Sequence, residues 1–305
     1  MRNPTAVQAI MREFSRSTGL SDTSHKPRRY LWTDAFAVCN FLELYRQTGE
    51  DGYLQSARKL VEQVHVVLGR YSEEDSRSGW LSGLDEKAGY QHPTLGGLRI
   101  GKQLTEREPE EPFDDRLEWD RDGQYFHYLT KWMQALTRMA AVTGEPRYQN
   151  WTLELARAAH AGFTYSPAPG VSRRMYWKMS IDLGRVLVPS MGQHDPLDAL
   201  LAYLELQAGT MLHDEIREAR ALCELTDPAF ALLAPTRVID IGIDVCKESI
   251  LPGSLLVPAG GRLAARQSNF HDRLDALESV FPGHHQAQRG AVLVGQLLTV
   301  HSRGE

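Results

Sequence analysis

The chain has 305 residues, of which 42% are hydrophobic and 24% charged, and this composition is that of a globular protein rather than a disordered one. The formal net charge of −5 is modest and both signs are interspersed, so neither nucleic acid nor an anionic membrane is expected as a partner. No apolar run approaches the roughly 20 residues that a transmembrane helix needs, which excludes a membrane span of that kind.

The N-terminus predicts an amphipathic helix rather than a secretory signal. Val7, Ile10, Met11 and Phe14 recur at helical spacing with arginines between them, and the apolar core of a signal peptide is missing. The three cysteines lie far apart and form no CxxC pair, so neither a zinc site nor a disulfide framework is indicated. These features favour a reduced, cytoplasmic compartment, and we expect neither a metal nor a cofactor.

The clearest pattern is an internal repeat with an offset of 95 residues. The segment LYRQTGEDGY at residues 44–53 resembles MAAVTGEPRY at residues 139–148, and the same offset pairs His65 with His160. In each copy an apolar stripe at helical spacing precedes the Thr-Gly-Glu turn and a second stripe follows it. The glycine of the turn suits the left-handed conformation that ends a helix, and so short a connection forces antiparallel neighbours.

Further along the chain the helical pattern weakens. We predict helix pairs over about 33–69 and 126–163, and a third pair over 195–226, because Asp195-Pro196 is a good helix start. Residues 227–305 have no clear period and are left unassigned. The chain is therefore predicted to be all-α, with repeated antiparallel hairpins in one domain over residues 1–305.

Two long connections separate these pairs, at residues 71 to about 124 and 164–194. Such lengths are uncommon in compact domains unless the connection is functional or disordered. Both connections contain tryptophan and tyrosine, which argues for ordered loops.

Hairpins with a Thr-Gly-Glu turn followed by tyrosine, joined by aromatic and acidic loops, resemble the α/α-toroid families, chiefly the six-hairpin glycosidases and the N-acylglucosamine 2-epimerase-like isomerases. The resemblance covers roughly residues 30–70 and 125–205. It implies a ring of inner helices around a funnel whose loops carry sugar-binding aromatics and catalytic carboxylates or histidines. A full toroid needs about a dozen helices and this chain offers roughly seven to ten, so an incomplete toroid and another helical repeat both stay open.

The segment from Phe113 to Tyr128 is the richest in chemical groups. Glu118, Asp120 and Asp122 would share one side of an extended loop, and clustered carboxylates can keep one acid protonated beside an ionised neighbour. The alternative is that Asp122 or a neighbour caps the helix beginning near Tyr125, while the others are solvated or paired with Arg116 and Arg121. An EF-hand is not expected, because Leu129 stands where the closing glutamate would be.

Residues 96–103 (GGLRIGKQ) nearly match a phosphate-binding loop. Gln103 replaces the residue that would hold magnesium, and no buried strand precedes the segment, so we do not expect nucleotide hydrolysis. A role for Arg99 or Lys102 beside an anionic group stays open.

Residues 175–196 form a second candidate cluster. Gln193, His194 and Asp195 immediately precede a predicted helix, where His194 could serve as a general base and Asp195 as the helix cap. His65 and His160, by contrast, lie on apolar faces and are predicted to be structural.

The leading hypothesis is a glycoside hydrolase-like enzyme whose acid and base come from Glu118, Asp120 and Asp122. The second is a sugar 2-epimerase or isomerase that uses His127 and His194. The third is a non-catalytic helical-repeat binding protein, and the sequence leaves the oligomeric state open. The third predicts a mobile, solvated acidic loop with no carboxylate pair facing a pocket. The two enzyme hypotheses expect a small saccharide as ligand, with these residues around it: Trp32, Asp34, Arg99, Trp119, Tyr125, Tyr128, Tyr176, Trp177, Lys178, Gln193 and Asp195.

Overall fold

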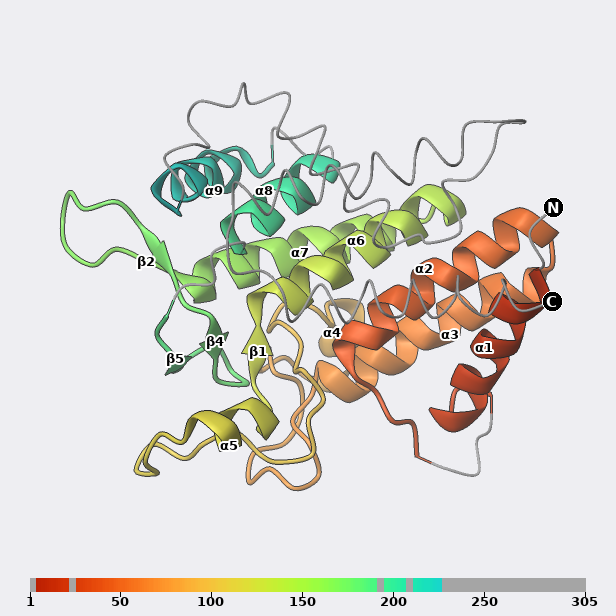
Figure 1. Ribbon diagram of the computed structural model, residues 1–305, viewed down its shortest axis with the longest axis horizontal. Coiled ribbons are helices and arrows are strands. Elements are labelled where there is room, and N and C mark those ends of the chain that lie inside the picture. Colours follow the sequence, from red (N-terminus) through yellow and green to blue (C-terminus); the bar gives the residue numbers. More distant parts are fainter. Residues whose placement is uncertain (1–3, 22–25, 191–194, 207–210, 227–305) are drawn as a thin grey trace, which may run out of the picture. The chain divides into compact units, whose positions relative to one another are not determined.

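The computed structural model describes residues 4–21, 26–190, 195–206 and 211–226, and this part of the chain is mostly helical (Figure 1). None of its helices is long and apolar enough to cross a membrane. The helices are α1 (Pro4–Ser17), α2 (Leu31–Thr48), α3 (Asp51–Leu68), α4 (Glu86–Gln91), α5 (Asp115–Asp120), α6 (Phe126–Thr143), α7 (Pro146–Phe163), α8 (Asp195–Glu205) and α9 (His213–Thr226). The strands are β1 (Gln124–Tyr125), β2 (Thr164–Tyr165), β3 (Arg174–Met175), β4 (Lys178–Met179) and β5 (Val186–Val188).

The chain divides into two compact units, and helices α2 to α8 and the side chains of the candidate site lie within the unit Phe14–Leu222. The predicted single domain also includes residues 227–305, which fall outside the described residues, so it stays a prediction.

The internal repeat is confirmed by the two hairpins α2–α3 and α6–α7. All four helices are 18 residues long, and α6 and α7 begin 95 residues after α2 and α3. α8 and α9 occupy the range predicted for the third helix pair.

The Thr-Gly-Glu turn has the same hydrogen bonds in both copies. The Thr48 hydroxyl donates to the Leu44 carbonyl at 2.8 Å and accepts from the Glu50 N–H at 3.1 Å, so it serves the last turn of one helix and the start of the next. Thr143 makes the equivalent pair of bonds at 2.7 and 3.2 Å. The glycines that follow, Gly49 and Gly144, are left-handed with φ of 72° and 69°. The signature is therefore a helix-capping device.

α6 is the central helix of this unit. It packs against its hairpin partner α7 and also against α2 and α8, so the first helices of successive pairs lie in the order α2, α6, α8 (Figure 1). Trp132 of α6 lies fully buried in the core, where its indole N–H donates to His65 of α3 at 3.1 Å. The ring of Trp151 of α7 contacts the same histidine edge-on at 4.9 Å. His65 is thus a structural residue, as its place on an apolar face predicts.

Each long connection returns to the start of its own hairpin. In the first, the Leu31 N–H at the start of α2 donates to the Ile100 carbonyl at 3.0 Å. In the second, β4 pairs antiparallel with β1, which lies immediately before α6, and β5 extends this sheet. Over residues 71–124 and 164–190 the connections are therefore ordered, as predicted, because their backbone groups bond to the residues that begin α2 and α6.

The left-handed glycines give a direct test of the repeat. Gly49→Ala and Gly144→Ala should each lower the free energy of unfolding by about 1 kcal/mol, because a Cβ is strained at positive φ although both positions face open space. Gly52→Ala is the matched control, since Gly52 lies inside α3 with nothing within 4 Å of the added Cβ. It should raise stability by roughly 0.5–1 kcal/mol. Urea unfolding measures all three, and a loss at Gly52 equal to that at Gly49 would contradict the cap assignment.

Acid should destabilise the protein through His65. Burial lowers the pKa of His65 to about 3, so the folded protein keeps this ring neutral while the unfolded chain protonates it near pH 6.5. The contribution of the neutral His65 ring to the free energy of unfolding is therefore fully present above pH 6.5 and is lost as the pH falls towards 3. Between pH 7 and 4.5 the wild type should lose about 2–3 kcal/mol more than His65→Gln, which keeps an acceptor for Trp132. Urea unfolding at the two pH values measures this, and an equal loss of stability in the wild type and in His65→Gln would contradict it.

Candidate functional site

Aromatic side chains from four separate segments meet at the N-terminal ends of α2 and α6. The ring centroids of Trp32 and Tyr128 lie 5.0 Å apart, those of Tyr125 and Trp177 5.3 Å, and those of Trp119 and Trp177 6.2 Å. The imidazole of His127 stacks on Trp177 at 6.5 Å and 16°. We call this set the aromatic cluster: Tyr30, Trp32, Trp119, Tyr125, His127, Tyr128 and Trp177.

The repeat places these residues. Tyr30 and Tyr125 are the extended residues immediately before α2 and α6, so they hold equivalent positions, as do Trp32 and His127 two residues further on. Because α2 and α6 pack side by side with their starts together, the two equivalent pairs become neighbours. The hydroxyls of Tyr30 and Tyr128 hydrogen-bond at 2.6 Å across this contact.

The aromatic cluster is partly accessible to solvent. Trp119 is 51% exposed, and Trp32, His127 and Trp177 are half-buried. Tyr125 lies beneath them, almost fully buried. Part of the ring surface of the cluster is therefore accessible to solvent, above the buried Tyr125.

His127 has a carboxyl group beside it. Its Nδ1 lies 3.7 Å from Asp195 Oδ1 at the start of α8, which is too long for a hydrogen bond. Burial raises the pKa of Asp195 well above its usual range, and Asp198 adds to this while Lys131 opposes it. Among the described residues the Asp195 Oδ2 has no hydrogen-bond partner. An imidazole beside a carboxyl group whose pKa is raised is an arrangement suited to proton transfer.

A buried ion pair supports the aromatic cluster from below. Lys178 of β4 is fully buried, donates to the carbonyls of Glu118 and Arg121 at 2.6 and 2.9 Å, and lies 3.0 Å from Glu118 Oε1. Arg107 Nε donates to the other oxygen of Glu118 at 2.8 Å. The ammonium lies 5.4 Å from the centre of the Tyr125 ring. Burial lowers the pKa of Lys178 while Glu118 opposes that shift. Together these contacts fix α5 to β4, which begins directly after Trp177.

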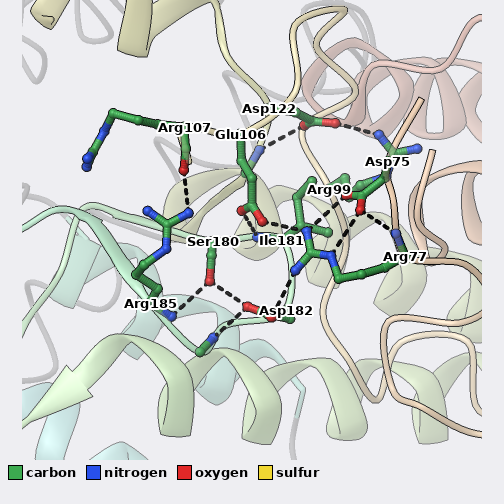
Figure 2. A network of polar contacts seen from close by, with 12 residues as sticks. Asp75, Arg77, Arg99, Glu106, Arg107, Asp122, Ser180, Ile181, Asp182 and Arg185 are labelled. Carbon is green, nitrogen blue, oxygen red and sulfur yellow. Dashed lines mark hydrogen bonds and ion pairs between the residues drawn. The ribbon is translucent and has the colours of Figure 1, made fainter. Parts of the chain in front are cut away.

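A second buried pair joins Asp122 to Arg99 (Figure 2). Asp122 also accepts from the Gly101 N–H at 3.0 Å, and Arg99 donates to the carbonyls of Val67 and Arg70 at the end of α3. Arg99 thus holds the first long connection against the end of α3, while Asp122 joins two parts of that connection.

Arg77 links the two long connections to each other. It donates to Asp75 at 2.9 Å, to Asp182 at 3.0 Å and to Glu106, and Figure 2 shows these carboxylates around it. Glu106 in turn accepts from the Ile181 N–H at 2.7 Å.

The expected extended arrangement of Glu118, Asp120 and Asp122 is wrong. Asp115–Asp120 is a helix, begun by the Asp114 side chain, which accepts from the Leu117 N–H. The three carboxylates consequently point to different surroundings: Glu118 towards Lys178, Asp122 towards Arg99, and Asp120 to the surface. The alternative pairing with Arg116 and Arg121 is wrong as well, because Glu118 pairs with Arg107 and Asp122 with Arg99, while Arg121 pairs with Glu111.

Several other predicted site residues lie outside the aromatic cluster. Tyr176 stacks on Tyr165 with centroids 4.1 Å apart and rings nearly parallel. Asp34 is buried one turn into α2, where it accepts from the Tyr30 N–H and lies 3.7 Å from Arg29. Burial raises the pKa of Asp34 to about 7. The guanidinium of Arg99 is bound to Asp122 and to two backbone carbonyls. Gln193 and His194 fall outside the described residues.

Tyr30 is the member of the aromatic cluster that sequence reasoning missed. A signal for it was available, because Tyr30 precedes Tyr125 by the repeat offset of 95 residues. Lys102, left open by the sequence, lies 5.0 Å from the Trp119 ring and donates to the Trp119 carbonyl.

Comparison with protein-family models, with curated proteins and with solved structures gives no match for this chain. Within the described residues, no group of three or more His, Cys, Asp or Glu side chains has the geometry of a metal site.

The buried ion pair beneath the aromatic cluster should be essential for stability. Lys178→Met should lower the free energy of unfolding by about 3–5 kcal/mol, because it leaves Glu118 buried with one cation instead of two. Lys26→Met is the matched control, since the pair of Lys26 with Glu73 is exposed and its loss should leave stability unchanged within error. Urea unfolding would contradict the assignment if the two variants lost the same stability.

Proposed function

We propose that the aromatic cluster binds a saccharide. Exposed faces of Trp32, Trp119 and Trp177 are suited to stacking on the apolar faces of a sugar ring, while the hydroxyl pair of Tyr30 and Tyr128 and the imidazole of His127 can bond to sugar hydroxyls. The observation that carries this proposal is the convergence of these side chains from four segments, with part of their ring surface left to solvent.

For the chemistry, the pair of His127 and Asp195 favours an isomerase or 2-epimerase over a hydrolase. Such an enzyme removes the proton from the carbon next to the sugar carbonyl and returns it to the other face or to the neighbouring carbon. His127 would serve as one proton-transfer group with Asp195 beside it. The predicted second histidine, His194, directly precedes Asp195 in the sequence.

The glycosidase hypothesis has less support. It requires two carboxyl groups on opposite sides of a glycosidic bond. Of the three predicted candidates, Glu118 and Asp122 are held in buried ion pairs and Asp120 is exposed at the end of α5. A non-catalytic protein could bind the sugar at the same surface. Exchange of the sugar's hydrogen for solvent deuterium distinguishes it from an isomerase.

Exchange of hydrogen for solvent deuterium tests both the binding of the sugar and the proton transfer. The protein is incubated in D₂O with aldoses, ketoses and 2-acylamino sugars, and proton NMR follows the hydrogen next to the carbonyl. We expect exchange into one of these sugars and its loss in His127→Asn, whereas His92→Asn, an exposed histidine paired with Glu154, should exchange as the wild type does.

Thermal shift with the same sugars measures binding separately. At a hundred times the dissociation constant a sugar should stabilise the protein by about 2.7 kcal/mol. Trp177→Ala should abolish this shift, and the neighbouring Tyr176→Ala, whose ring stacks elsewhere, should retain it. Binding without exchange would leave a saccharide-binding protein. Neither binding nor exchange with any sugar would contradict the proposal.

A further inference from the structure

Residues 105–120 form a loop that closes on itself, which we call the acidic loop. Its flanking residues Leu104 and Arg121 form an isolated β-bridge, and the Asp122 N–H donates to the Leu104 carbonyl at 2.8 Å. Inside the loop, Arg107 binds Glu118 and donates to the Glu111 carbonyl, so the two halves are fastened together. Compact loops whose ends meet in this way are frequently functional.

The acidic loop accounts for the net negative charge of the chain. It contains eight carboxylates and two arginines, a net charge of −6, whereas the entire chain has a net charge of −5. Glu106 and Glu118 are buried in ion pairs. Five of the other carboxylates are exposed, and these are Glu108, Glu110, Asp114, Asp115 and Asp120.

Apolar side chains are exposed on the same loop and its edge. Of the eleven large apolar side chains exposed in the described part of the chain, four lie here: Leu104 at 46%, Phe113 at 53%, Leu117 at 39% and Trp119 at 51%. Four of eleven within sixteen consecutive residues is a concentration, and exposed apolar groups gathered in one place mark interaction sites.

We propose that the acidic loop is a docking surface for a basic segment of a partner protein that carries apolar side chains between its lysines and arginines. The exposed carboxylates repel nucleic acid and anionic membranes, which leaves a positively charged polypeptide as the complementary ligand. Phe113 and Leu117 supply the apolar contacts. Because buried ion pairs already fix the loop, little conformational entropy is lost when a partner binds.

This surface is separate from the proposed saccharide site except at Trp119. Phe113 and Leu117 are not members of the aromatic cluster, and Phe113 contacts Arg107 instead. Variants at these two residues therefore test docking without altering the saccharide site.

The test uses the full chain and a labelled 16-residue peptide of alternating basic and apolar residues, with a second peptide in which glutamate replaces every basic residue. Fluorescence anisotropy should show binding of the basic peptide that weakens as salt rises. Glu108→Gln/Glu110→Gln/Asp115→Asn should weaken it about tenfold, and Phe113→Ser/Leu117→Ser should weaken it by at least as much. The control Glu50→Gln/Glu62→Gln/Glu74→Gln removes the same charge from exposed positions elsewhere and should bind as the wild type does.

Three outcomes would overturn the proposal. The first is that the basic peptide binds no better than its acidic counterpart. The second is that the loop and control variants weaken binding equally, which would show a general charge effect. The third is that sedimentation of the wild type reveals a dimer that Phe113→Ser/Leu117→Ser dissociates, because a second copy would then occupy the surface.

Discussion

The packing of α2 against α6, with their first turns together, is the contact on which the site depends. An extended tyrosine precedes each helix and an aromatic ring follows two residues later, so two copies of one sequence pattern form a single surface. Trp132 and His65 hold the hairpins together in the core, where the hydrogen bond between them satisfies two buried polar groups. A change in the register of these helices would separate Trp32 from His127 and divide the aromatic cluster.

Ion pairs hold the long connections in place, as backbone hydrogen bonds hold the strands of a sheet. The connections have little regular structure, and Lys178, Arg99 and Arg77 each bond to carboxylates or carbonyls from distant parts of the sequence. Removing a charge from water is costly and is offset only by good geometry, so such pairs favour one arrangement over its alternatives. In this protein that arrangement sets Trp119 and Trp177 beside Tyr125.

Three groups of side chains with different chemistry thus stand out among the described residues. The aromatic cluster offers aromatic rings and hydroxyls, His127 and Asp195 form the proposed proton-transfer pair, and the acidic loop carries exposed charged and apolar groups. Trp119 belongs to the first and third parts, so occupation of the acidic loop by a partner would alter the edge of the proposed saccharide site. Binding at one surface can in this way be coupled to binding at the other.

The sequence by itself determined the helical hairpins, their repeat and their caps, because these depend on apolar periodicity and on turn residues close together in the chain. It also singled out most members of the aromatic cluster, since tryptophan and tyrosine in long loops need something to pack on. The closed ring of a toroid stays an expectation from resemblance. Only the tertiary structure decided which carboxylates are structural and which rings meet. Glu118 finds Lys178 sixty residues away and Tyr176 finds Tyr165 rather than its neighbours, and no local pattern specifies such partners.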